Sequence, residues 1–143
     1  MKVVVDSNIA VSGLLWTGPP NRILKWCRDG ILEILGCVET TDEVRRVLQY
    51  EKFSERLSHL DTTPNEAFAY FVNLILFVPT PQHIHPVVRE DLFDNIFLSL
   101  ASENKVHMII SGDKHLLDLK QYNDIQIVTP SEAVNILKML LNK

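Results

Sequence analysis

The chain has 143 residues, a length typical of a single domain with its own hydrophobic core. Its 14 lysines and arginines against 18 aspartates and glutamates give a formal net charge of −4, which argues against broad electrostatic binding to nucleic acid or anionic membranes. Two cysteines form neither a disulfide framework nor a spaced zinc motif, and no apolar run approaches a membrane span. We expect one soluble, cytoplasmic domain over residues 1–143.

Short apolar segments alternate along the chain with longer amphipathic ones. The short segments are bounded by breakers or charges, and they predict strands buried on both faces over residues 2–5, 33–37, 74–78, 106–110 and 125–128. Apolar residues spaced by three and four predict helices over residues 20–29, 40–50, 64–75, 95–104 and 130–141. Because this alternation needs crossover connections, it predicts an α/β domain of three layers, α/β/α, around a mostly parallel sheet.

Four acidic residues stand where predicted strands end or predicted helices begin. Asp6 and Asp113 each follow a strand, Glu43 falls in the first turn of a helix, and Asp94 opens another. Ligands of open parallel sheets bind outside the carboxyl ends of the strands. The crossovers could therefore bring these four carboxylates together at one edge of the sheet.

Each acid also has a purely structural explanation. Aspartate is a common helix N-cap, and a glutamate three residues after a threonine forms a capping box. The chain has this spacing three times, at Thr40–Glu43, Thr63–Glu66 and Thr129–Glu132. Asp6 is different, because Ser7 or Asn8 could equally cap a helix that starts at "SNIAV". The joint pattern, rather than any single residue, is the argument for a site.

A convergence of these acids would have a definite chemistry. Neighbouring carboxylates raise one another's pKa unless a cation neutralises them, and hard oxygen ligands favour Mg²⁺ or Mn²⁺. Mg²⁺ keeps several waters and completes its shell with substrate phosphate. One or two such ions would hold a scissile phosphate and activate an attacking water. The pattern therefore favours a phosphodiester hydrolase.

Five stretches of the chain resemble the signature segments of PIN domains, in particular of the PIN-domain toxins of bacterial and archaeal toxin-antitoxin pairs. In order they are "VVVDSNIAVSGLLW", "GPPNRILKW", "TTDEVRRVL", "DLFDNIFLSLA" and "SGDKHLLDLK". The resemblance runs from Val3 to about Leu137. It implies a three-layer α/β/α fold, a metal-dependent ribonuclease acting on single-stranded RNA, frequent homodimers, and a small antitoxin protein that blocks the site.

The resemblance also implies roles for individual residues. The family's four acidic positions fall on Asp6, Glu43, Asp94 and Asp113, and a further acid seen in many members falls on Asp91, for which a solvated loop charge is the alternative. Three polar residues could hydrogen-bond waters or phosphate beside the metal, although capping or a turn explains them as well. They are Ser7, Asn8 and Ser111.

Other functions stay open on the sequence alone. A phosphatase with an aspartyl nucleophile needs a second aspartate two residues on, where this chain has Asn8, and a phosphoacceptor domain needs paired acids where only Asp6 stands. The main alternative is a PIN-like binding or scaffold module with a silent site, because a fold does not determine a function.

Aromatic and basic residues are less informative. Five aromatic residues could stack on bases, but their apolar helical surroundings favour packing in a core or a dimer. They are Trp16, Trp26, Phe68, Tyr70 and Phe71. Arg45 and Arg46 could contact phosphate or could simply belong to an exposed helix face.

Overall fold

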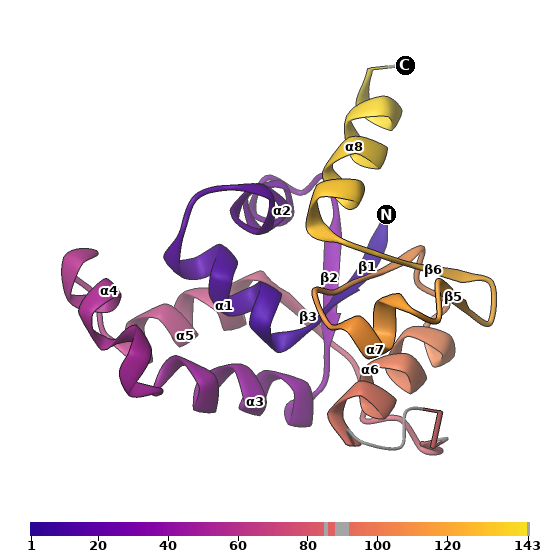
Figure 1. Cartoon of the computed structure of the whole chain (residues 1–143), viewed down its shortest axis with the longest axis horizontal. Coiled ribbons are helices and arrows are strands. Elements are labelled where there is room, and N and C mark those ends of the chain that lie inside the picture. Colours follow the sequence, from indigo (N-terminus) through magenta and orange to yellow (C-terminus); the bar gives the residue numbers. More distant parts are fainter. Residues whose placement is uncertain (85, 88–91, 143) are drawn as a thin grey trace.

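The computed structural model contains a six-stranded sheet in the order β3-β2-β1-β4-β6-β5 (Figure 1). The structure describes residues 1–84, 86–87 and 92–142, with only the backbone of 92 and 93. The strands are β1 (Lys2–Val5), β2 (Glu33–Gly36), β3 (Ile75–Phe77), β4 (Met108–Ile110), β5 (Gln121–Tyr122) and β6 (Ile125–Val128). Every pairing is parallel except that of β5 with β6. The predicted mostly parallel sheet is therefore confirmed.

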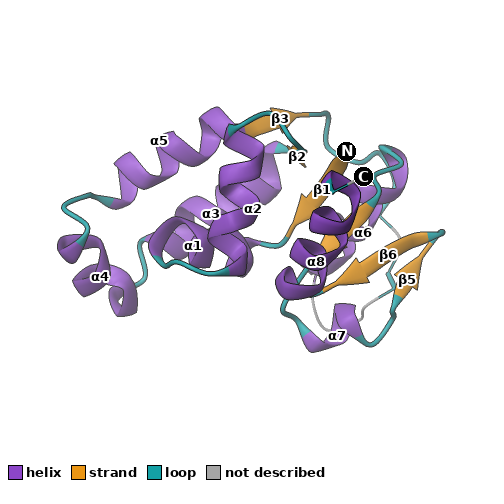
Figure 2. Ribbon diagram, turned by 90° about the horizontal axis from the view of Figure 1, so that it is seen from above, coloured by secondary structure: helices purple, strands orange, loops and turns teal. Residues whose placement is uncertain are grey.

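Helices flank this sheet (Figure 2). They are α1 (Ser7–Leu15), α2 (Pro19–Arg28), α3 (Val38–Leu48), α4 (Ser54–His59), α5 (Pro64–Leu74), α6 (Leu92–Glu103), α7 (Lys114–Leu117) and α8 (Pro130–Leu141), with a 3-10 turn, η1 (Glu51–Phe53), before α4. No helix in the described part of the chain is long and apolar enough to cross a membrane. The predicted α/β class is confirmed, and the five predicted helices correspond to α2, α3, α5, α6 and α8.

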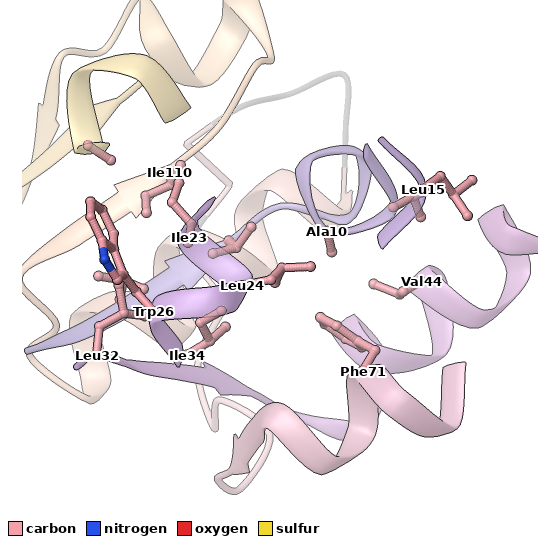
Figure 3. Packing of buried hydrophobic residues seen from close by; sticks show 14 of the residues in the cluster. Ala10, Leu15, Ile23, Leu24, Trp26, Leu32, Ile34, Val44, Phe71 and Ile110 are labelled. Carbon is pink, nitrogen blue, oxygen red and sulfur yellow. The ribbon is translucent and has the colours of Figure 1, made fainter. Parts of the chain in front are cut away.

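Side chains of the central strands alternate between two hydrophobic layers. In β1, Val3 and Val5 face a layer built with α1, α2, α3, α5 and α8, whereas Val4 faces a layer built with α6 and α7. Figure 3 shows part of the first layer, where Ile23 and Leu24 of α2 pack over the sheet near Ile110. Because successive strand residues point to opposite faces, a strand covered on both sides needs an uninterrupted apolar run.

Four elements were not among the predicted ones: α1, α4 with η1, α7 and β5. Helix α1 buries residues on several sides, so its sequence has no single apolar stripe. One of them is Gly13, where an added Cβ would lie 2.8 Å from the Pro20 carbonyl oxygen and from Leu24 Cδ1 of α2. The other three elements span only two to six residues, too few for a periodic pattern to emerge.

The prediction that every strand is buried on both faces is wrong for β3. Its residues Leu76 and Phe77 are 43% and 46% exposed. The strand lies at the edge of the sheet and pairs only with β2, so helices cover it incompletely.

Candidate functional site

The four acidic side chains singled out in the sequence line one small pocket. Asp6 comes from the β1–α1 junction, Glu43 from α3, Asp94 from α6 and Asp113 from the β4–α7 junction. Ser7, Asn8 and Phe97 complete the lining, and the pocket has a volume of about 40 Å³. A space of this size holds a few water-sized groups. Residues more than 100 positions apart thus meet where strands β1 and β4 end.

Asp6 is the best-anchored of the four. Only 6% of the residue is exposed, and its Oδ1 accepts a hydrogen bond from the Ile9 N–H at 2.9 Å, which makes it the N-cap of α1. Its Oδ2 accepts from the Ser111 hydroxyl and from the Gly112 N–H at 3.2 Å. On the sequence alone, Ser7 or Asn8 could equally have capped the helix, but the backbone is still extended at Asp6 and Ser7 is already helical.

Burial raises the pKa of Asp6 above its ordinary value of 3.8, against the opposing effect of its hydrogen bonds from Ser111, Ile9 and Gly112. The charge of nearby Asp113 raises this pKa further. Within the described residues, no lysine, arginine or histidine forms an ion pair with Asp6 or Asp113. A cation in the pocket would therefore stabilise the ionised form of Asp6.

Glu43 is not a capping residue, so the predicted Thr40–Glu43 capping box is wrong. Helix α3 begins at Val38 with Cys37 as its N-cap, which puts Glu43 in the second turn. The Cys37 N–H donates to Thr40 Oγ1 at 3.0 Å, which fills the role expected of a capping glutamate. The side chain of Glu43 reaches the pocket instead, and its Oε2 is buried.

The other two predicted caps are present. The Glu66 N–H donates to Thr63 Oγ1 at 3.1 Å at the start of α5. Thr129 and Glu132 form a reciprocal capping box at the start of α8. The same spacing therefore caps two helices and fails at the third, where the chain enters the helix two residues earlier than predicted.

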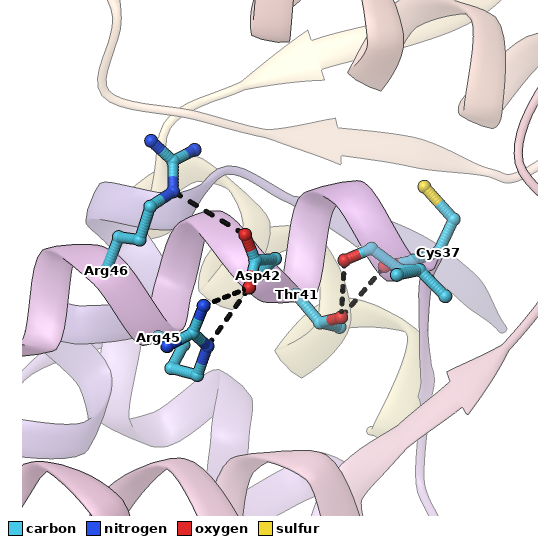
Figure 4. A network of polar contacts seen from close by, with 6 residues as sticks. Cys37, Thr41, Asp42, Arg45 and Arg46 are labelled. Atoms are coloured by element: carbon cyan, nitrogen blue, oxygen red, sulfur yellow. Dashed lines mark hydrogen bonds and ion pairs between the residues drawn. The ribbon is translucent and has the colours of Figure 1, made fainter.

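Asp42, directly before Glu43, has a different environment (Figure 4). Its side chain is 45% exposed and pairs with Arg45 at 2.5 Å and with Arg46 at 3.7 Å. The two arginines proposed as phosphate contacts are thus bound to Asp42 on an exposed helix face. Asp42 is an acid next to the pocket that does not belong to it, which makes it a matched control for Glu43.

Asp94 and Asp113 complete the acidic lining. Asp94 lies in the first turn of α6 and is 5% exposed. Asp113 is the N-cap of α7, with its Oδ1 accepting from the His115 N–H at 2.7 Å. Of the four acids, Asp6 and Asp113 therefore combine a cap with a place in the pocket.

The remaining predicted residues occupy different positions. Ser7 lines the pocket, and its buried Oγ has no hydrogen-bond partner within the described part of the chain. Asn8 lines the pocket and is exposed. Ser111 lies behind Asp6 and not in the lining, because its hydroxyl donates to Asp6 Oδ2 and accepts from the Asp113 N–H at 2.9 Å. Asp91 lies outside the described residues.

The pocket offers oxygen donors only, which suits a hard cation such as Mg²⁺ or Mn²⁺. Among the side chains that the structure describes, no group of three or more His, Cys, Asp or Glu residues is placed so that it could hold a metal ion as it stands. Mg²⁺ commonly takes one or two carboxylates and keeps its waters. The donor set therefore fits such an ion with water completing the shell.

Comparison with known sequences assigns the family. No curated protein matches the chain. The family model described as PIN domain matches residues 2–115, a stretch that includes β1 to β4 and all four acids of the pocket. PIN domains are generally nucleases and are typically metal-dependent. The resemblance to PIN domains is confirmed over residues 2–115, and the chain belongs to the PIN-domain family.

Proposed function

We propose that this protein is a divalent-metal-dependent endoribonuclease that hydrolyses phosphodiester bonds of single-stranded RNA. The observation that carries the proposal is the convergence of Asp6, Glu43, Asp94 and Asp113 on one pocket of a PIN domain. Helix capping does not account for this convergence, because Glu43 lies in a second helical turn and caps nothing.

In this proposal the four carboxylates, with Asp91 as a fifth ligand, hold one or two Mg²⁺ or Mn²⁺ ions. A bound ion would lower the pKa of an attached water and offset the charge of the scissile phosphate. The chain supplies the orientation: Ile9, Ser111 and Gly112 fix both oxygens of Asp6. The buried Ser7 hydroxyl and the exposed Asn8 amide are donors available to water or phosphate.

The narrower proposal is that the protein is the toxin of a toxin-antitoxin pair. Its support is the resemblance of the five sequence stretches to PIN-domain toxins. Such a protein would act in the cytoplasm, form a homodimer, and be inhibited by a small antitoxin protein. Induced expression in a bacterial host should then arrest growth, and a Glu43→Gln variant should not arrest it.

The decisive experiment is cleavage of a mixed-sequence single-stranded RNA by purified protein with Mn²⁺ or Mg²⁺. We expect cleavage that EDTA abolishes and that Asp6→Asn removes, with calorimetry reporting metal binding by the wild type. Cleavage that survives EDTA, or an equally active Asp6→Asn variant, would refute the site. If the protein neither cleaves the RNA nor binds metal, the silent binding or scaffold module is favoured instead.

A further inference from the structure

Three aromatic and two cationic side chains form a connected cluster at the far end of α1 from Asp6. We call it the aromatic cluster, and it consists of Trp16, Tyr50, Lys52, Phe53 and Arg56. The elements that carry it, the C-terminal ends of α1 and α3 with η1 and α4, lie together on the left of Figure 1, away from the sheet. No residue of the cluster lines the acidic pocket.

Ring contacts connect the members of the cluster. The Trp16 and Phe53 rings meet edge to face, with centroids 5.9 Å apart. The Arg56 guanidinium lies 5.7 Å from the Trp16 ring centroid, and Lys52 Nζ lies 5.1 Å from that of Phe53 and 6.0 Å from that of Tyr50. Arg56 is itself held in place, because its Nε donates to the Leu15 carbonyl oxygen at 2.7 Å.

Two of the three aromatic residues of this cluster are exposed, and the third, Phe53, is partly buried against the core. Trp16 is 41% exposed and Tyr50 is 50% exposed, whereas Trp26 is only 7% exposed. Of the two predicted environments, core or dimer, Trp26 lies in the core, whereas Trp16 is not buried within the chain and only the dimer interpretation stays open for it. Large exposed rings bordered by cations are what proteins use to stack on nucleic-acid bases.

A hollow of about 360 Å³ adjoins the cluster, with Tyr50 and Ser54 in its wall. Its volume lies within the range of small-molecule sites. Hydrogen-bonding side chains line much of the rest, among them Gln49, Ser58, Thr62 and Thr63. Such groups can bond to the edge of a base whose face rests on a neighbouring ring.

We propose that the aromatic cluster and the adjoining hollow bind unpaired bases of a single-stranded RNA whose scissile phosphate lies in the acidic pocket. The inference rests on the proposed function, which it extends from the chemistry to the recognition of the strand. Two helices connect the sites: Asp6 and Trp16 flank α1, about 15 Å apart along its axis, and Glu43 lies about 7 Å along α3 from Leu48, two residues before Tyr50. A few nucleotides would bridge this span.

Charge favours bases over phosphates as the main ligand of this surface. Glu51 and Glu55 lie on the same short elements as Lys52 and Arg56, so their formal charges cancel. Asp61 and Glu66 in the wall of the hollow make the whole surface formally negative. A surface without net positive charge gains nothing from counterion release, and stacking and hydrogen bonds to bases must then supply the affinity. Duplex RNA, whose bases are already stacked and paired, should therefore bind poorly.

The test measures binding of a labelled mixed-sequence single-stranded RNA in EDTA, where no metal-dependent cleavage occurs. Trp16→Leu and Tyr50→Ala should each weaken binding about 5- to 150-fold, and Trp16→Phe, which keeps a ring, should retain most of it. Tyr70→Ala is the matched control, because Tyr70 is 44% exposed on α5 and lies outside the cluster. Circular dichroism establishes that each variant is folded.

Tryptophan emission gives an independent readout. Single-stranded RNA should quench the exposed Trp16, and Trp16→Phe should lose that quenching because only the buried Trp26 remains. The inference is overturned if the cluster variants bind RNA as well as Tyr70→Ala does, or if duplex RNA binds and quenches equally. The surface would then be assigned to a protein partner.

Failure of this inference and failure of the proposed function give different results. If RNA binds through Trp16 but is never cleaved with Mn²⁺ or Mg²⁺, the binding surface is supported and the nuclease is not. If RNA is cleaved with metal and the cluster variants bind and cleave like the control, the nuclease stands and the surface is refuted.

Discussion

Both ends of helix α1 are capped by a charged side chain, but different groups surround the two caps. At the N-terminus, Asp6 Oδ1 accepts from the Ile9 N–H, and at the C-terminus, Arg56 Nε donates to the Leu15 carbonyl oxygen. An acid at the start and a base at the end are the charges that the helix dipole favours. Around these caps, the N-terminal end has three further carboxylates and the C-terminal end has exposed aromatic rings. Capping explains Asp6 and Asp113 at one end and Arg56 at the other, and the remaining carboxylates and rings point to function.

The largest effect is expected at the N-terminal end, from Glu43→Gln. Mutation of a residue that only hydrogen-bonds to a metal ligand typically lowers metal affinity or activity by about 10- to 100-fold. Loss of Glu43, a proposed direct ligand, should therefore lower the RNA cleavage rate by at least about 100-fold. The comparison is with Asp42→Asn on the same helix, whose carboxylate is exposed and bound to arginines. Initial rates at saturating Mn²⁺ should differ clearly between the two variants; equal losses would contradict a specific role for Glu43 in cleavage.

The next largest effect is expected from Ser111→Ala, which tests how Asp6 is held in place. The change removes a donor to Asp6 and the acceptor of the Asp113 N–H in a fully buried position. We expect a loss of about 1–3 kcal/mol in the free energy of unfolding, measured with urea. Ser99→Ala is the control, because the buried Ser99 hydroxyl has no partner among the described residues and its removal should cost little.

Ser111→Ala should also shift the titration of the Asp6 carboxyl. The hydrogen bond from Ser111 lowers the pKa of Asp6, so without it this pKa should rise further. Because the folded-state pKa lies above 3.8, Asp6 contributes stability at low pH that is lost as the pH rises through that pKa. In the metal-free variant this loss should occur over a higher pH range, which carboxyl NMR would detect, and an unchanged titration would contradict the coupling.

At the C-terminal end, Arg56→Ala should destabilise the fold by about 1–2 kcal/mol, because the Leu15 carbonyl loses a charged donor. Arg28→Ala removes an arginine whose ion pair with Asp29 is half exposed on both sides, and it should cost much less stability than Arg56→Ala. Urea denaturation of both variants measures the difference. Similar small losses would mean that Arg56 does not hold this end of α1.

The smallest effect is expected at Glu39, an acid of α3 outside the pocket. The Thr80 hydroxyl donates to Glu39 at 2.6 Å and holds the pKa of Glu39 below its ordinary value of 4.5. This contribution is present above pH 4.5 and disappears as the pH falls through the lowered pKa. Glu39→Gln should therefore be slightly less stable than wild type at neutral pH and equal to it in acid. A deficit that grows in acid would contradict this sign, which is opposite to that of Asp6.

Local sequence predicted the parts of the fold that depend on local pattern. The apolar run of β1 and the apolar stripe of α8 were placed correctly, because hydrophobic residues recur at different spacings in strands and in helices. Helix α1 was not predicted because it packs on several sides, and α3 begins at Val38 because Thr40 bonds to Cys37 rather than to Glu43. A threonine–glutamate spacing does not say which of two nearby residues begins the helix.

The acids of the pocket could be named from their positions at strand ends and helix starts, but the residues that hold Asp6 in place could not. That Ser111 and Gly112 bind Asp6 depends on β4 lying beside β1, which strand order decides and no short stretch encodes. The exposure of Trp16 likewise depends on how η1 and α4 pack against the end of α1. The aromatic cluster was missed because it forms from segments that are separate in the sequence, Trp16 and residues 50–56.

The pairing of β1 with β4 also determines when the pocket can exist. Asp6 leaves the ribosome 88 residues before Asp94 and more than 100 residues before Ser111 and Asp113. A nascent chain that ends before β4 lacks both Asp113 and the strand that holds Asp6 in place. Because synthesis proceeds from the N-terminus, the acidic pocket is completed only after β4 and the start of α7 have been made. A ribonuclease organised in this way would have no complete site on the nascent chain until that point, and would until then spare the message from which it is being made.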